Sequence, residues 1–182
     1  MARRKTLSAI QDEQLGFKEK PDYLTVKVMV RSIPHDRSVV YPACPNVKED
    51  GRKCQKKLIQ GVDGWSCESC NRVVEAPEYR YIFNMEVMDY SGSQYVQLFN
   101  DEGERFFEIP AGRMNELEKS NSEEYEKVFK NRLFKEYIMT LRVKVDQSMT
   151  SRVRCTVYRF DPVDVDKEVD DLASLLDSMQ LD

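Results

Sequence analysis

Four of the five cysteines in this chain fall within one short stretch, and their spacing constrains the fold more than any other feature. Cys67 and Cys70 form a Cys-x-x-Cys pair, and Cys44 and Cys54 precede it. A Cys-x-x-Cys turn directs two sulfur atoms at one point, and a second pair completes a tetrahedral shell for Zn²⁺. Because all four ligands are cysteines, no coordination position stays open for a substrate. We therefore predict one structural zinc ion.

Length and composition narrow the class of protein. The 182 residues suffice for one well-buried domain with an appendage. No uninterrupted apolar run approaches the roughly 20 residues of a membrane span, so we expect no membrane partner. The first residues, MARRKTLSAI, lack the apolar stretch of a secretory signal. We therefore expect a reducing compartment, in which clustered cysteines bind metal more often than they form disulfides.

The net charge of −4 is unevenly distributed along the chain. Residues 161–182 hold eight acidic residues and one basic residue, which leaves a net charge of +3 on the remainder. A zinc ion with four thiolates carries two negative charges, so the body of the protein is close to neutral. Such a body does not attract polyanions through its overall charge. Any nucleic-acid site must therefore be a local stripe of Lys and Arg.

Alternation of apolar and polar side chains predicts five strands. They are expected at residues 24–30, 79–90, 94–100, 137–146 and 152–160. Residues 112–131 read as one or two helices between the third and fourth strands, with Ser120 and Glu123 as a capping box. Three strands, a helical connection and two strands is the order of an OB-fold, a small Greek-key barrel whose strand faces and loops commonly bind single-stranded nucleic acid.

The predicted architecture is mainly β: a five-stranded OB-fold barrel with an inserted zinc ribbon and a C-terminal amphipathic helix. We expect a linker at residues 1–20, with a short helix near residues 7–15. The barrel is expected at residues 21–162, with the ribbon inserted at about residues 41–76. An oligomerisation helix is expected at residues 163–182, with Asp164 as its N-cap.

The last helix carries an apolar stripe at steps of four and three residues, the spacing of a seam that packs against other helices. A single helix of this length with an acidic remainder is marginal alone, so we expect it to bind a partner. The stripe residues are Val165, Val169, Leu172, Leu176 and Met179.

Several segments resemble the C-terminal part of the large subunit of replication protein A, the eukaryotic heterotrimer that binds single-stranded DNA. They are KTLSAIQDEQLGFKEKPDY, YPACP, WSCESC, RVKV and SRVRCTV, and the resemblance covers nearly the whole chain. It implies an OB-fold with an inserted zinc ribbon, a last helix that enters a three-helix bundle with two smaller OB-fold subunits, and nuclear work in DNA replication, repair and recombination. Two features depart from the family. The first cysteine pair is widely spaced, and the loop at residues 147–151 has no aromatic residue.

Single strands are bound by aromatic faces that stack on bases and by cations along the backbone. The aromatic candidates are Tyr90, Tyr95 and Phe99, and the first two flank a turn where the family also tends to carry aromatic residues. The cationic candidates are Arg80, Arg142, Lys144, Arg152 and Arg154. The last four are expected on one surface of adjacent strands, where like charges repel and a phosphate would relieve the repulsion.

Alternatives remain open at this point. The chain fits a telomere-dedicated relative of the large subunit, or a scaffold whose barrel binds DNA weakly. The basic residues of the cysteine segment either compensate the negative metal centre or extend the DNA path; they are Lys48, Arg52, Lys53, Lys56, Lys57 and Arg72. Catalytic zinc keeps an open position beside an acid or base, and the lone histidine, His35, lies outside the quartet. We therefore expect neither an enzyme nor a small-molecule substrate. Trp65 is expected to pack on the ribbon.

Overall fold

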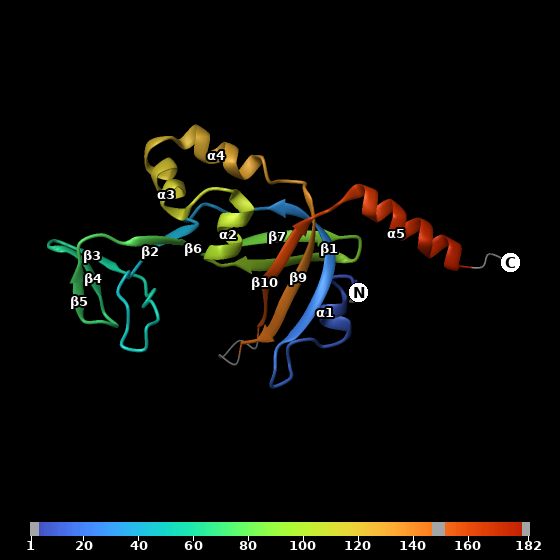
Figure 1. The fold of residues 1–182 in the computed structure, drawn as a ribbon, viewed down its shortest axis with the longest axis horizontal. Helices are drawn as coiled ribbons and strands as arrows, with labels where there is room; N and C mark the ends of the chain where they lie inside the picture. Colours follow the sequence, from blue (N-terminus) through green and yellow to red (C-terminus); the bar gives the residue numbers. More distant parts are fainter. Residues whose placement is uncertain (1–3, 147–151, 180–182) are drawn as a thin grey trace. The chain divides into compact units, whose positions relative to one another are not determined.

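The computed structural model describes residues 4–146 and 152–179 (Figure 1). Five strands form a closed barrel in the order β1-β7-β8-β10-β9, which confirms the predicted mainly β fold. Their bounds are Asp22–Ser32 for β1, Phe83–Asp89 for β7, Gly92–Leu98 for β8, Glu136–Val145 for β9 and Val153–Pro162 for β10. Within the described residues, no helix combines the length and the apolar character that crossing a membrane requires.

The cysteine segment forms short strands between β1 and β7. β2 (Val40–Ala43) pairs with β6 (Glu78–Tyr81), and these two strands are the stem of the insertion. Beyond the stem, a three-stranded sheet has the order β3-β4-β5. Its strands are Ile59–Gly61, Gly64–Cys67 and Arg72–Val74. The insertion therefore consists of a two-stranded stem and a three-stranded sheet, which agrees with the ribbon that the sequence predicts.

Alternating burial in β1 follows the predicted pattern. Leu24, Val26, Val28 and Val30 are all buried, and Val26 and Val30 have no exposed surface. β1 pairs with β9 in antiparallel register, and β9 pairs with β10 with a bulge between Val157 and Arg159. Each fully buried valine stabilises the fold by roughly 1.5–3 kcal/mol. Burial of this face is therefore a main reason why β1 turns these side chains toward the barrel interior.

The second predicted strand is in fact two strands. β6 ends at Tyr81 and β7 begins at Phe83, with Ile82 between them. The side chains of Tyr81, Phe83, Met85 and Val87 are buried, as predicted. Their strands nevertheless belong to different sheets, because the chain changes partner at Ile82. The third strand begins and ends two residues earlier than expected.

Three helices, not one or two, follow β8: α2 (Asn100–Phe107), α3 (Ala111–Ser120) and α4 (Ser122–Lys130). Of these, α2 was not predicted from the sequence. The capping box was also wrong. Asn121 caps α4 by accepting a hydrogen bond from the backbone N–H of Glu124, and the Ser120 hydroxyl donates instead to the carbonyl of Glu116.

Contacts divide the chain into two compact units. The first comprises residues 1–30, 87–94 and 134–182, and the second comprises residues 31–86 and 95–133. An aromatic cluster fills the second unit, with ring centroids of neighbouring residues about 5–6 Å apart. Its members are Tyr81, Phe83, Phe106, Phe107 and Phe129. His35 stacks on Phe129, with ring centroids 4.0 Å apart, and its Nε2 lies 3.0 Å from Glu126.

Residues 4–16 lie in the first unit and are not a free linker, which corrects the expectation from the sequence. Leu7, Ile10 and Leu15 are buried, and α1 (Ala9–Asp12) lies within this segment. The backbone N–H of Lys5 donates to the Thr25 carbonyl of β1 at 2.9 Å. The segment packs because three apolar side chains recur in it, a pattern masked by the many charged residues between them.

Candidate metal centre and nucleic-acid interface

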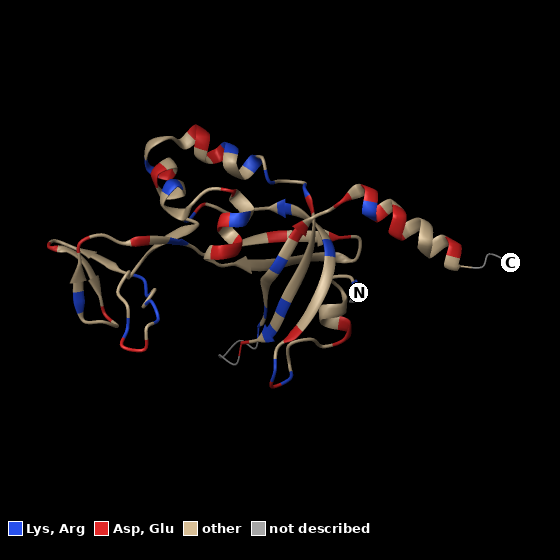
Figure 2. Cartoon of the chain, in the orientation of Figure 1, with Lys and Arg blue, Asp and Glu red and all other residues tan. Residues whose placement is uncertain are grey.

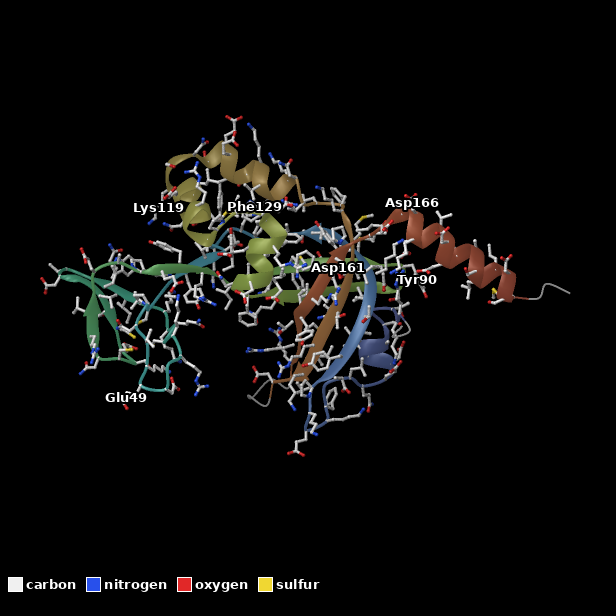
Figure 3. The ribbon with its side chains drawn as sticks, viewed as in Figure 1. Glu49, Tyr90, Lys119, Phe129, Asp161 and Asp166 are labelled. Carbon is white, nitrogen blue, oxygen red and sulfur yellow. The ribbon has the colours of Figure 1, made fainter. Side chains whose placement is uncertain are left out.

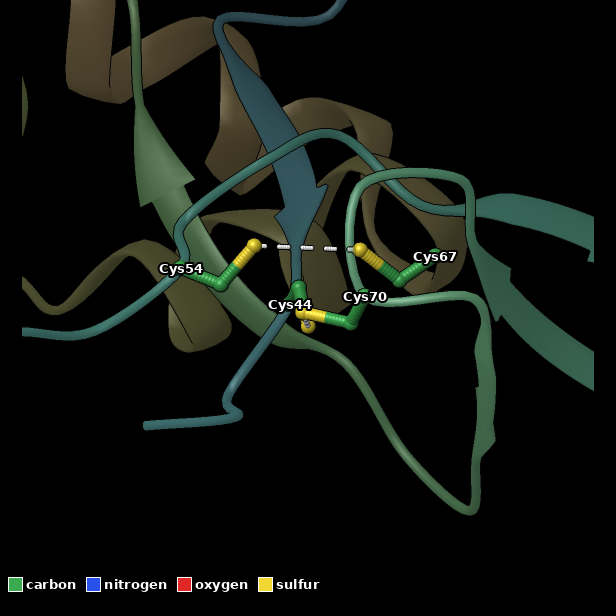
Figure 4. Close-up of side chains that lie close together, drawn as sticks. All are labelled: Cys44, Cys54, Cys67 and Cys70. Atoms are coloured by element: carbon green, nitrogen blue, oxygen red, sulfur yellow. Dashed lines mark hydrogen bonds between the residues drawn. The ribbon is translucent and has the colours of Figure 1, made fainter. Parts of the chain in front are cut away.

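The ribbon brings the four cysteines of the predicted zinc site together (Figure 4). Cys44 directly follows β2, Cys54 lies in the loop before β3, and Cys67 ends β4. Cys70 lies in the turn before β5. Three of the four are buried and Cys70 is half-buried, so the site is closed on most sides by the protein.

The sulfur positions fit a tetrahedral metal ion. All four sulfur atoms lie within 4.8 Å of one another. The Sγ atoms of Cys44 and Cys70 are 4.0 Å apart, and those of Cys54 and Cys67 are 3.7 Å apart. A Zn–S bond of about 2.3 Å places the sulfurs of a tetrahedral shell about 3.8 Å from each other. The residues present can therefore hold one metal ion with no further ligand.

The acidity of these thiols reflects their crowding. A backbone N–H from Lys56 lowers the pKa of Cys54 to about 7. The hydrogen bond between Cys70 and Cys54 raises the pKa of Cys70 to about 12. Burial raises the pKa of Cys44. Four thiolates in so small a space repel one another, and a divalent cation at their centre removes that repulsion.

Local backbone conformation prepares the site. Gln55, directly after Cys54, has a positive φ of 56°, and this turn aims the following N–H at the Cys54 sulfur. The backbone N–H of Cys44 donates to the Lys56 carbonyl at 2.8 Å and thereby ties the first cysteine pair together. Trp65 is half-buried and packs against the cluster formed by Leu58 and the cysteines, as predicted.

Basic residues on β9 and β10, together with Arg152 directly before β10, are the candidate cations of the first unit (Figure 2). Arg154 lies opposite Lys144 in the strand register, so these two residues share one face of the sheet. The repulsion is already reduced within the protein. Arg154 forms an ion pair with Asp146 at 2.6 Å, and the Lys144 Nζ donates to the carbonyl oxygens of Lys18 and Glu19 at 2.8 and 2.5 Å.

Arg142 and Arg152 are the more available cations of this unit. Both are exposed, and neither has an ion pair within the described residues. The loop at residues 147–151, which was noted above for its lack of aromatic residues, lies outside the described residues. The unit also holds Tyr90, which is 93% exposed in the turn between β7 and β8 (Figure 3).

One aromatic pair was not predicted from the sequence. Tyr23 of β1 and Tyr158 of β10 meet edge to face with ring centroids 5.3 Å apart, and both rings are more than half exposed. Tyr23 also lies opposite Arg142 in the register. The alternation of β1 and β10 places both rings on the outer face, and that signal could have found them.

The second unit holds the remaining candidates. Tyr95 of β8 is 55% exposed and Phe99 is 45% exposed. The sequence placed Phe99 on the third strand, but in the structure it is the N-cap of α2. Arg80 lies on β6 opposite Tyr41 and is half-buried. The eight candidate residues are thus split between the two units.

α5 (Val165–Ser178) carries four of the five residues of the predicted apolar stripe, and the fifth, Met179, is the C-cap directly after the helix. Asp164 caps it by accepting a hydrogen bond from the backbone N–H of Lys167. No residue of α5 is buried. The stripe residues are 58–68% exposed: Val165, Val169, Leu172, Leu176 and Met179. In the described structure nothing covers this stripe.

An ion-pair network, not predicted from the sequence, holds the first turn of α5. The Glu168 carboxylate lies 2.6 Å from Arg4 and 3.6 Å from Lys27 of β1. Lys27 also lies 3.9 Å from Glu136 of β9. Only 15% of the Glu168 side chain is exposed, so the network is partly shielded from water and orients the helix where it leaves β10.

Comparison with known sequences places these features in a family. The Replication factor-A C terminal domain model matches residues 23–172. A replication protein A 70 kDa DNA-binding subunit from Oryza sativa subsp. japonica is 33% identical over 98% of this chain. Replication factor A protein 1 of Schizosaccharomyces pombe is 32% identical over 98% of it. The chain spans 19% and 29% of the length of these two relatives.

Solved structures agree. A chain of "Structure and Conformational Change of a Replication Protein A Heterotrimer Bound to ssDNA" superposes with a TM-score of 0.85 and 32% identity, covering 97% of this chain and 40% of that one. A chain of "Yeast RPA bound to ssDNA" superposes with a TM-score of 0.83 and 30% identity, covering 98% of both chains. With its closed barrel and cysteine-bearing ribbon, this chain belongs to the Replication factor-A C terminal domain family.

Proposed function

We propose that this chain binds single-stranded DNA and joins two smaller subunits in a replication protein A-type heterotrimer. One observation carries the proposal: the chain superposes over 98% of its length on 98% of a chain described as "Yeast RPA bound to ssDNA". Both the barrel and the ribbon take part in that match. The names of the relatives, which are replication proteins, support general DNA replication over a telomere-dedicated role.

The proposed DNA contacts combine stacking and phosphate neutralisation. In the first unit, Tyr90 would stack on a base, while four cations would face phosphates: Arg142, Lys144, Arg152 and Arg154. In the second unit, Tyr95 and Phe99 would stack and Arg80 would pair with a phosphate. Exposed rings support the stacking roles. Lys144 and Arg154 already bind other groups of the protein, a carbonyl oxygen and the Asp146 carboxylate. Arg142 and Arg152 are therefore the stronger phosphate candidates.

The metal ion is proposed to be zinc with a structural role. Four cysteine ligands select zinc over hard cations, which prefer oxygen. When bound, the ion supplies a cross-link between the two ends of the insertion. Cys44 and Cys54 hold one side of that cross-link and Cys67 and Cys70 the other, so zinc fixes the loop in which the basic residues of the ribbon lie.

α5 is proposed as the assembly element. Its stripe of exposed apolar side chains needs a partner surface, and a three-helix bundle with one helix from each smaller subunit supplies it. The domain division that follows is a barrel with its ribbon up to residue 162 and an oligomerisation helix from residue 163. Work in DNA replication, repair and recombination within the nucleus follows from the same proposal, with no catalytic step.

Titration of the full chain with a labelled oligothymidylate at several salt concentrations tests DNA binding. Phosphate contacts release counterions, so the logarithm of the affinity should fall linearly with the logarithm of salt concentration. Binding that is undetectable at low salt would reduce the chain to an assembly scaffold. Co-expression with candidate smaller subunits, with and without residues 163–182, tests assembly separately, and retained assembly after the deletion would refute the bundle.

A further inference from the structure

The second unit contains an open groove that none of the proposed DNA or metal contacts uses. Its volume is about 710 Å³. The stem strands β2 and β6 line it together with Trp65 of β4 and the end of α3. Pockets of this size take a side chain or short segment of a partner.

Aromatic rings form the apolar walls. Trp65, Tyr41 and Tyr79 all line the groove and are half-buried. Two of the rings are held in place. The Lys119 ammonium lies 5.6 Å from the centroid of the Tyr79 ring, and the Tyr41 hydroxyl donates to the Gln55 carbonyl at 3.2 Å. Rings that are already fixed lose little conformational entropy on binding, and Trp and Tyr are typical anchors of protein interfaces.

Three cations surround this apolar floor. Arg37, Lys57 and Lys119 are exposed and line the groove, and none has an ion pair within the described residues. Its one carboxylate, Glu118, already accepts a hydrogen bond from the Ser38 hydroxyl at 2.6 Å. The groove is therefore positively charged at its edges, and a negatively charged occupant matches it. Figure 3 labels Lys119 on α3.

The groove and the proposed DNA contact on the stem use different residues. Tyr79 of β6 lines the groove, whereas its neighbour Arg80 is not among the lining residues. Apolar walls with charges at the edges are also the anatomy of a protein interface, whereas a nucleic-acid path is a continuous basic track.

We propose that this groove binds a short acidic segment of a partner protein. An apolar side chain of the segment contacts Trp65 and Tyr79, and its carboxylates face Lys57 and Lys119. The proposal is independent of DNA binding, because none of the proposed DNA contacts lines the groove.

Trp65 is the only tryptophan in the chain, so its fluorescence reports on the groove directly. The full chain is titrated with a panel of acidic peptides of about twelve residues, each with one central Leu, Ile, Phe or Tyr. A matched panel carries Asn and Gln in place of the acidic residues. The acidic panel should change the Trp65 emission and bind at least about tenfold more tightly than the neutral panel, with an affinity that falls as salt rises.

The peptide affinity of a variant with two groove lysines reversed in charge is compared with that of a variant with two lysines reversed outside the groove. Lys57→Glu with Lys119→Glu should weaken peptide binding by about tenfold or more. Lys130→Glu with Lys135→Glu, two exposed lysines that do not line the groove, should leave it unchanged. Thermal melts of both variants check folding.

Three outcomes overturn the proposal. In the first, no acidic peptide changes the Trp65 emission up to about 1 mM, a Kd worth only about −4 kcal/mol. In the second, both double variants weaken peptide binding equally, which means that the affinity depends on the overall charge of the protein and not on this groove. In the third, an oligothymidylate competes with the peptide for the Trp65 signal, which assigns the groove to nucleic acid.

Discussion

The guanidinium of Arg4 and the carboxylate of Glu168 lie 2.6 Å apart and join the N-terminal segment to the first turn of α5. Lys27 approaches the same carboxylate from β1. The helix that carries the exposed apolar stripe is thus held at one end only. The rest of α5 has no buried residue, so its direction depends on these few charges until a partner covers the stripe.

Glu168→Gln should loosen α5 without altering the stripe. The loss of a partly shielded ion pair costs about 1 kcal/mol, so we expect faster amide hydrogen exchange in the first turns of α5 and several-fold weaker assembly with the smaller subunits. Asp170→Asn, an exposed acid on the same helix, is the control and should have no effect. Equal behaviour of the two variants would show that the network does not position the helix.

Cys70→Ser should remove the metal ion and loosen the ribbon. A shell of three cysteines and a hydroxyl binds zinc more weakly, since a thiolate is the better ligand. We expect less than one zinc per chain by elemental analysis and faster proteolysis within residues 41–76. Cys155 is buried but lies outside the cluster. Cys155→Ala should therefore keep one zinc per chain, and zinc loss from this variant would contradict the assignment.

Asp22 should contribute a pH-dependent part of the stability. The N–H of Gly16 donates to its carboxylate at 2.8 Å, and this bond, with the Lys18 charge, holds the pKa of Asp22 below its usual value. A lowered folded-state pKa stabilises the protein above the unfolded value of about 3.9, and the contribution is lost as the pH falls further. Asp22→Asn should cost about 1 kcal/mol at pH 7.

Urea unfolding at several pH values measures this effect. The difference between the wild type and Asp22→Asn should shrink as the pH falls below about 4. Asp171→Asn, an exposed acid of α5, should show no such trend. A difference that stays constant down to low pH would mean that the variant acts through packing and not through charge.

Two glycines make a matched pair for the helical region. A Cβ at Gly103 of α2 would lie 2.6 Å from the Tyr81 Cβ, whereas a Cβ at Gly112 of α3 would meet nothing within 4 Å. Gly103→Ala should destabilise the protein by roughly 1–3 kcal/mol through overpacking. Gly112→Ala should stabilise it by about 0.5–1 kcal/mol, because alanine favours a helix. Denaturant unfolding compares them, and equal effects would refute the close packing of α2 on β6.

Two double variants assign the DNA contacts. Tyr95→Ala with Phe99→Ala should weaken oligothymidylate binding by about 1–3 kcal/mol per lost stacked base while leaving the salt dependence unchanged. Arg142→Ala with Arg152→Ala should flatten the salt dependence by about 0.7 per lost phosphate contact. Anisotropy titrations at several salt concentrations separate the two. If neither variant changes binding, the DNA path lies elsewhere, and Tyr23 with Tyr158 becomes the next pair to test.

The sequence predicted correctly those features whose structure depends only on residues close by in the chain. The alternation of β1, the N-cap at Asp164 and the cysteine spacing all express local geometry, and the structure confirms them. The cap of α4 was not predictable in the same way. Ser120, Asn121 and Ser122 are all good capping residues, and only the packing of the helices places the break at Asn121.

The sequence by itself determined the barrel strands, the four sulfur ligands and the apolar stripe. The strands and the stripe follow the periods of a strand and a helix, and the ligands are four cysteines within one short segment. Only the tertiary structure decided what the side chains between those repeats contact. It ties the Lys144 ammonium to two carbonyl oxygens, seats residues 4–16 on the barrel strands and gathers Trp65, Tyr79 and three cations around one groove. These contacts join residues far apart in the chain, and no local pattern encodes them.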